Sequence, residues 1–148
     1  MKFLLVAITA VLSIINTKAS ASDETKVSAA ILSSFNSSFK NASEVAWKNS
    51  GNFYKANFTM NGQYVTAFYD ATAKLLAVTR NISSVQLPVT LQTSLKNCYE
   101  AYWISDLFEL SDENGTSYYV TVENGDAKIT LKSTQTNDWT VYQKSRKS

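Results

Sequence analysis

The side chains that most often carry out catalysis are scarce in this sequence, and this limits the chemistry available to it. The 148-residue chain contains no histidine and only one cysteine, Cys98. Without histidine there is no ordinary general base, no common metal ligand and no partner to activate a serine or cysteine nucleophile. The four glycines stand apart from one another, so no glycine-rich phosphate loop is present. The sequence therefore predicts a protein that is not an enzyme and has neither a cofactor nor a metal site.

Paired carboxylates are the remaining route to acid–base chemistry. Asp106 with Glu109, or Asp112 with Glu113, could serve as acid and base in glycoside hydrolysis. In a strand, however, Asp106 and Glu109 point to opposite faces, and the second pair belongs to a predicted turn. We therefore interpret both pairs as solvated surface charge.

Cys98 lies in a helical pattern. Leu91, Leu95, Cys98 and Tyr102 follow one another at helical spacing and share one face. This spacing predicts a buried, inert thiol. The alternative is a reactive or intermolecularly paired thiol, which is less favoured because no histidine is present to activate it.

The first 21 residues have the pattern of a secretory signal peptide. Lys2 supplies a positive charge, an apolar run covers residues 3–15, and Ala19-Ser20-Ala21 forms an A-x-A cleavage site, so Ser22 becomes the first exported residue. The apolar run is shorter than the roughly 20 residues of a membrane-spanning helix, which makes an uncleaved anchor the weaker alternative. We expect a periplasmic or extracellular protein that does not insert into the membrane after cleavage.

The charge of the exported chain argues against nucleic acid as its partner. Of the 14 Lys and Arg residues, Lys2 and Lys18 lie in the predicted signal peptide, so the other 12 balance the 12 Asp and Glu residues. A protein without excess cations has little means of displacing the counterions of a phosphate backbone.

Hydrophobic periodicity predicts a helix followed by four strands, and then the same order again. Apolar residues recur every four positions in the first helix, near 24–40, and the second helix, 89–102, follows the only proline, Pro88. Short turns between strands favour antiparallel pairing. The predicted strands cover 44–48, 53–60, 63–70, 74–82, 104–110, 117–123, 126–132 and 139–144. We expect an α+β tandem repeat, about 22–86 and 87–148, with two four-stranded antiparallel sheets and the helices on one sheet face.

Two Asn-Gly pairs predict tight hairpin turns and thereby sort side chains between sheet faces. At Asn61-Gly62, a two-residue turn pairs Met60 with Gln63 and leaves a second, mixed face opposite the apolar one. That mixed face holds Phe53, Lys55, Asn57, Thr59, Tyr64, Thr66, Phe68 and Asp70. The same rule applied to Asn124-Gly125 gives a plainer polar face of Tyr119, Thr121, Glu123, Asp126, Lys128 and Thr130.

Aromatic side chains among polar neighbours on an open sheet face are typical of protein interfaces. The candidate binding residues are Phe53, Lys55, Tyr64, Thr66, Phe68, Tyr119 and Lys128. The alternative is that these aromatics only support the sheet through cross-strand contacts.

The order of motifs resembles the PepSY-like, or β-lactamase-inhibitor-protein-like (BLIP-like), domains of bacterial envelope proteins. Their pattern is a helix ending in Phe-x-x-x-Phe, an "A-x-x-V-x-W" strand, a "Y-x-A-x-F-x-x-N-G" hairpin, a strand ending in Asp, and a proline before the second helix. The matching residues are Phe35, Phe39, Ala42, Val45, Trp47, Tyr54, Ala56, Phe58, Asn61, Gly62, Asp70 and Pro88. This sequence lacks the glycine that usually begins the fourth strand, within 70–74.

The resemblance implies a secreted, non-catalytic module that binds a protein, as an inhibitor or regulator of a peptidase or another envelope enzyme. A structural or small-ligand-binding envelope protein without an inhibitory role is the alternative.

Overall fold

The computed structural model describes residues 25–134 and 137–148, so the predicted signal peptide and its cleavage site lie outside the described residues. Within these ranges, none of the helices has the length and apolar character needed to cross a bilayer. The helices are α2 (Ala29–Ser38), η2 (Ser84–Gln86, a 3₁₀ turn) and α3 (Val89–Cys98). The strands are β1 (Ser43–Asn49), β2 (Tyr54–Met60), β3 (Gln63–Tyr69), β4 (Leu75–Asn81), β5 (Trp103–Asp112), β6 (Gly115–Glu123), β7 (Ala127–Ser133) and β8 (Thr140–Arg146).

The eight strands form one continuous antiparallel sheet in the order β1 to β8. The prediction of two separate four-stranded sheets is therefore wrong. Strands β4 and β5 pair directly, from Ala77 opposite Asp112 to Asn81 opposite Phe108. An unpaired edge strand exposes its N–H and C=O groups, and this pairing satisfies two such edges. Only β1 and β8 remain as edges of the sheet.

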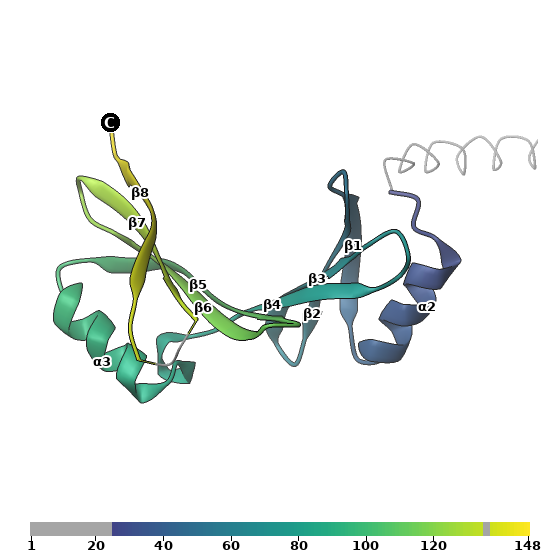
Figure 1. The fold of residues 1–148 in the computed structure, drawn as a ribbon, viewed down its shortest axis with the longest axis horizontal. Coiled ribbons are helices and arrows are strands. Elements are labelled where there is room, and N and C mark those ends of the chain that lie inside the picture. Colours follow the sequence, from purple (N-terminus) through teal and green to yellow (C-terminus); the bar gives the residue numbers. More distant parts are fainter. Residues whose placement is uncertain (1–24, 135–136) are drawn as a thin grey trace, which may run out of the picture.

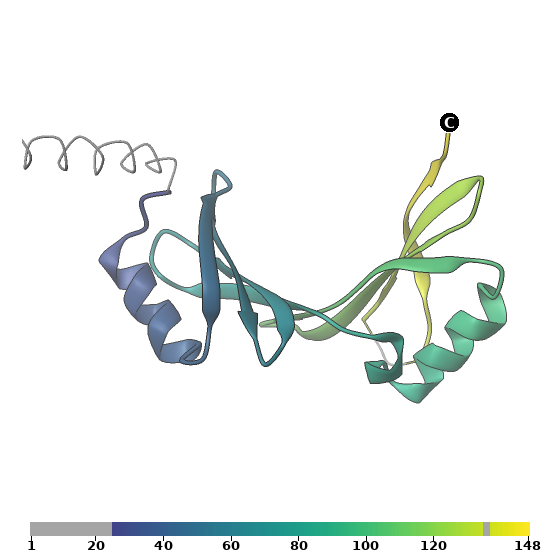
Figure 2. The same cartoon turned by 180° about the vertical axis from the view of Figure 1, so that it is seen from behind.

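The molecule is elongated, with a helix towards each end (Figure 1). Helix α2 lies near β1 to β3 and α3 lies near β5 to β8, while β4, β5 and β6 cross the middle; Figure 2 shows the same arrangement from behind. The register carries one sheet face across this middle, because Val65 lies opposite Arg80 and Arg80 opposite Glu109. Both helices therefore cover the same side. We call it the helix face, and the other side the open face.

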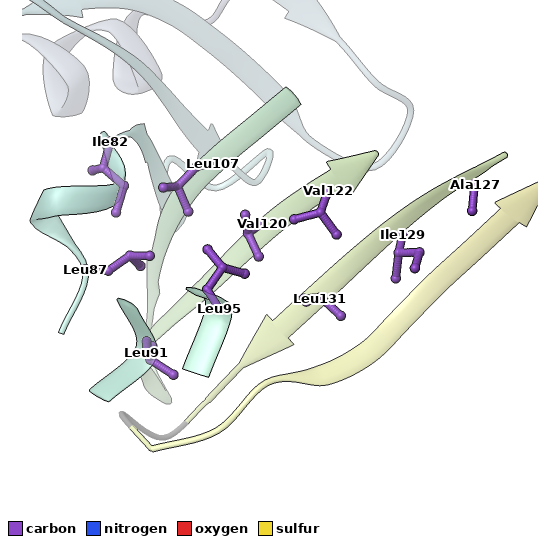
Figure 3. Close-up of a cluster of buried hydrophobic side chains, with 10 residues drawn as sticks. All are labelled: Ile82, Leu87, Leu91, Leu95, Leu107, Val120, Val122, Ala127, Ile129 and Leu131. Atoms are coloured by element: carbon purple, nitrogen blue, oxygen red, sulfur yellow. The ribbon is translucent and has the colours of Figure 1, made fainter. Parts of the chain in front are cut away.

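Each helix packs on its own hydrophobic core. Ile31 and Phe35 of α2 lie on the first core, whose strand residues are Ala56, Phe58, Val65, Ala67 and Tyr69. Leu91 and Leu95 of α3 lie on the second core, drawn in Figure 3. Its other buried members are Ile82, Leu87, Leu107, Val120, Val122, Ala127, Ile129 and Leu131.

A polar ladder lies between the two cores on the helix face. Arg80 donates from Nη1 to Gln63 Oε1 at 3.3 Å and from Nη2 to both Glu109 carboxylate oxygens at 3.2 Å. Glu109 in turn lies opposite Tyr118. Burial, and then the Glu109 charge, raise the pKa of Tyr118. These hydrogen bonds join β3, β4 and β5 through side chains and so support the pairing of β4 with β5.

The first Asn-Gly turn is confirmed. Asn61 and Gly62 have φ values of 53° and 75°, as a two-residue hairpin turn requires. Met60 pairs with Gln63 and Tyr54 pairs with Tyr69, as the sequence predicts.

The second turn differs from its prediction. Glu123 pairs with Lys128, so the centre of the turn lies at Gly125-Asp126 and not at Asn124-Gly125. The Asn124 side chain stabilises this arrangement by accepting the N–H groups of Asp126 at 2.9 Å and Ala127 at 2.8 Å. The register shift is two residues, so the predicted faces are unchanged and only Asp126 moves into the turn.

The helices are shorter than predicted. Helix α2 begins after Ser28, whose Oγ accepts the N–H of Ile31 at 3.3 Å, and α3 ends at Cys98. Leu91 and Leu95 are buried, but Cys98 is exposed. The prediction of a buried thiol is wrong because the helix stops at this residue and its last turn does not reach the core.

The loop between β3 and β4 is held by Asp70. Its Oδ1 accepts the Thr72 N–H at 2.9 Å, the Thr72 hydroxyl at 2.7 Å and the Lys74 N–H at 3.0 Å. Ala73 in the same loop has φ = 68°, a left-handed conformation that glycine adopts without steric cost. The loop thus keeps the geometry of a glycine turn although no glycine is present.

We expect Ala73→Gly to raise the free energy of unfolding by about 0.5–1 kcal/mol, since relief of left-handed strain exceeds the added flexibility of the unfolded chain. Urea denaturation measures the change. Ala71→Gly is the matched control, because Ala71 has no positive φ; it should be neutral or destabilising. Equal effects of the two substitutions would contradict this account of the loop.

The same loop should make stability depend on pH. The Thr72 hydroxyl and the Lys74 N–H lower the pKa of the Asp70 carboxyl below 3.8. A lowered folded pKa gives stability that is present above the unfolded pKa and is lost as pH falls through the folded pKa. We expect the melting temperature of Asp70→Asn to fall less than that of the wild type between about pH 5 and pH 2. Parallel pH profiles would show that the carboxylate contributes nothing.

Candidate protein-binding face

The seven predicted binding residues all belong to the open face but do not form one cluster. Lys55 lies opposite Phe68, Tyr64 opposite Thr59, and Thr66 opposite Asn57. Tyr119 lies opposite Phe108, and Lys128 opposite Glu123. The structure therefore spreads them along the sheet from β2 to β7.

Phe53, Lys55 and Phe68 contact one another at one end of this face. The Phe53 and Phe68 rings meet edge to face at 5.5 Å between centroids, and Lys55 Nζ lies 5.9 Å from the Phe68 centroid. All three side chains are half-buried. These contacts favour cross-strand support for this group, and its role in binding stays a prediction.

A row of aromatic side chains crosses the middle of the open face and continues to its other end. Phe108 stacks on Tyr119 at 5.0 Å with an interplanar angle of 10°, and Tyr119 meets Tyr142 edge to face at 5.5 Å. On the other side, Phe108 lies opposite Asn81. Asn81 and Tyr64 line one hollow on the open face. We call Tyr64, Phe108, Tyr119 and Tyr142 the aromatic row.

Lys132 lies against the aromatic row. Its Nζ is 5.2 Å from the Tyr119 centroid and 5.9 Å from the Tyr142 centroid. The hydrogen bond to Tyr119 raises the pKa of Lys132, so this cation stays charged. The β7–β8 end of the row thus carries a positive charge beside two tyrosines.

The ends of the row are open to solvent. Tyr64 is 72% exposed and Tyr142 is 62% exposed. Trp103 on β5 is also exposed, with Lys147 Nζ 4.5 Å from its ring and 2.9 Å from Glu123 Oε1. Hydrogen bonds from Ser105 and Lys147 lower the pKa of the Glu123 carboxyl. The open face therefore presents aromatic surface from β3 to β8.

Sequence reasoning missed Phe108 and Tyr142 as members of this surface. Phe108 pairs with Asn81 only because β4 and β5 share a sheet. Tyr142 sits beside the irregularity in the β7–β8 register, which the sequence did not indicate. Trp139, by contrast, packs against the second core and donates from Nε1 to the Leu91 carbonyl at 3.0 Å.

The Asp106–Glu109 pair is not arranged for acid–base chemistry. Asp106 is on the open face, where it accepts the Asn81 side-chain amide at 3.3 Å, whereas Glu109 is on the helix face and pairs with Arg80. Across residues 25–134 and 137–148, no three His, Cys, Asp or Glu side chains are grouped so as to hold a metal ion.

A second hollow, of about 470 Å³, lies on the helix side between α3 and the start of β5. Its walls include Leu95, Tyr99, Tyr102 and Ile104. The Tyr99 and Tyr102 rings meet edge to face at 5.5 Å. Its size lies within the range of small-molecule sites.

Comparison with known proteins places the fold. No family model matches the sequence, and no curated protein matches it. A BLIP-like protein from Bacteroides fragilis superposes with a TM-score of 0.70 at 24% identity, covering 82% of this chain and 87% of that one. A DUF2874 family protein from Bacteroides uniformis gives 0.72 at 17% identity, covering 82% and 90%. A candidate periplasmic protein from Bacteroides eggerthii gives 0.74 at 12% identity, with the same coverage.

These structures define the class of fold. The chain has the BLIP-like fold that the sequence motifs suggested, shared with DUF2874 proteins of Bacteroides.

Proposed function

We propose that this protein is an exported, non-catalytic module that binds a partner protein on its open face. The aromatic row is the observation that carries the proposal. Exposed tyrosines contribute large contact area with few rotatable bonds, and such residues dominate the energy of protein interfaces. The helix face is unsuited to the same role because α2 and α3 already cover its two cores.

The partner that fits best is an envelope enzyme, with this protein as its inhibitor or regulator. The likeness to a structure described as BLIP-like supports this choice, as does the predicted signal peptide. A rigid open sheet also suits inhibition, because a preformed surface loses little conformational entropy on binding.

Small-ligand binding is a second candidate, favoured by the hollow beside α3. A compound that raises the melting temperature of the wild type but not of Ile104→Glu would support it, because Ile104 lines that hollow. No such shift across an apolar compound library would count against it.

Photo-cross-linking tests the binding proposal. A benzophenone amino acid replaces Thr79, in the middle of the open face, or Ser37, an exposed residue of α2. After irradiation in envelope extract of the source organism, we expect a discrete protein adduct from position 79 and none from position 37. Adducts from position 37 alone would contradict the proposal. So would the absence of adducts from both position 79 and a second open-face position, Thr130.

A further inference from the structure

The hollow on the open face contains an unusual acidic residue. This hollow, of about 340 Å³, is lined by residues of β1 to β4 that include one acid, Glu44, and no base. Glu44 has φ = 55° and lies where the β1–β2 register is interrupted by a bulge. A left-handed backbone at a non-glycine residue carries strain, and bulges of this kind redirect a side chain. Here the redirected side chain is a carboxylate at the wall of a hollow.

The Glu44 carboxylate has no cationic partner within the described chain. The ion pairs found there are Lys74–Glu113, Arg80–Glu109 and Lys147–Glu123. Thr59 Oγ1 makes a long contact of 3.4 Å to Glu44 Oε2. Thr59 is followed across the sheet by Tyr64, its register partner on β3. An acid and an exposed aromatic ring therefore stand on either side of a threonine.

We propose that this hollow receives an arginine side chain of the partner protein; the inference rests on the proposed function. Adjacent strands lie about 4.8 Å apart, so Glu44 and Tyr64 are separated by about 10 Å, two strand intervals. A long side chain can lie on the Tyr64 ring and reach Glu44 with its terminal group. The hydroxyl of Thr59 and the Asn57 side chain are polar groups along this path.

Arginine suits the hollow better than lysine. Its planar guanidinium donates two parallel hydrogen bonds to a carboxylate, a paired contact that the ammonium of lysine does not match in geometry. We also expect this arginine to belong to a protein and not to be a free small molecule. The hollow is open along the sheet towards Asn81, whose register partner Phe108 begins the stacked part of the aromatic row. A partner lying on that row can place an arginine at its end.

Titration with N-acetyl-L-arginine amide tests the inference, followed by the backbone amide signals of Glu44, Thr59 and Tyr64 in NMR spectra. We expect saturable shifts with a Kd on the order of 10 mM. Glu44→Gln should weaken binding at least about tenfold, since it keeps the shape but removes the charge. Glu113→Gln, a change of an exposed acid elsewhere, should leave the Kd unchanged. N-acetyl-L-citrulline amide, neutral and of similar shape, should not bind.

Comparison of two variants separates charge from backbone strain. Glu44→Gln removes only the charge, whereas Glu44→Gly removes the charge and the strain, so we expect both to lose arginine binding and only Glu44→Gly to raise the melting temperature. Absence of saturable shifts, equal affinity for the citrulline compound, or an unchanged Kd in Glu44→Gln would overturn the inference. The inference and the proposed function can be distinguished: an adduct at position 79 without arginine binding would support the binding face and overturn only the arginine site.

Discussion

Replacing Leu91 by alanine should lower the free energy of unfolding by about 3–4 kcal/mol. Leu91 is fully buried where α3 meets the second core (Figure 3). Its backbone carbonyl also accepts the Trp139 indole N–H at 3.0 Å, which ties the start of β8 to the helix. Loss of the side chain leaves a cavity that the strands beneath cannot close, because they are held in register by their neighbours.

Urea denaturation followed by tryptophan fluorescence measures this effect. Val89→Ala is the control, since Val89 is 74% exposed only two residues away in the same helix; it should change stability by less than about 0.5 kcal/mol. A Leu91→Ala effect below about 1 kcal/mol would mean that α3 does not anchor the second core.

Both halves of the sheet carry a tryptophan for the fluorescence measurement, because Trp47 packs on the first core and Trp139 on the second.

The single sheet also predicts that its two halves unfold cooperatively. Because β4 and β5 join the two halves, Leu91→Ala should speed hydrogen exchange of β2 amides as well as β6 amides. Unchanged exchange in β2 would indicate that the halves unfold independently, as two separate sheets would.

The sequence predicted the local structure well because local rules decide it. The Asn61-Gly62 turn requires two positive φ values, and once it is placed the faces of β2 and β3 follow. The start of α3 directly after Pro88 was also predicted, whereas α2 begins after Ser28 and not near residue 24 as the periodicity suggested. The second turn was misplaced because Asn124 uses its side chain to cap the turn that follows it.

The pairing of β4 with β5 could not be predicted in the same way. Both are amphipathic strands whose periodicity fits an edge as well as an interior position. Whether β4 pairs with β5 depends on how α3, which lies between them in the sequence, packs on the sheet. That packing involves residues far apart in the sequence. The candidate site shares this limit, because Phe108 joins the row with Tyr64 only through the β4–β5 pairing.

The strained bulge at Glu44 was also beyond sequence reasoning. Its residues fit an ordinary strand pattern, and neither glycine nor proline marks the irregularity. The loop at Ala73 is a similar case, since the usual glycine is absent and Asp70 supplies the hydrogen bonds.

Changing Tyr64 and Tyr142 together to serine should reduce the affinity for the partner protein about 100-fold while leaving the fold intact. Both side chains are mostly exposed and lie at the two ends of the aromatic row. Their removal takes away contact area on the partner, while Phe108 and Tyr119 keep their stacking in the free protein. We expect the melting temperature to fall by no more than about 2 °C, as exposed substitutions seldom cost more than about 0.5 kcal/mol.

The most direct test of the binding face is the Kd of the cross-linked partner, once isolated, for three forms of the exported protein. These are the wild type, Tyr64→Ser with Tyr142→Ser, and Val85→Ser with Val89→Ser. The second pair removes two equally exposed apolar side chains from η2 and α3 on the helix side. A partner on the open face predicts about a 100-fold higher Kd for the tyrosine variant and an unchanged Kd for the valine variant. An unchanged Kd for the tyrosine variant, with a large rise for the valine variant, would place the partner on the helix face and contradict the proposal.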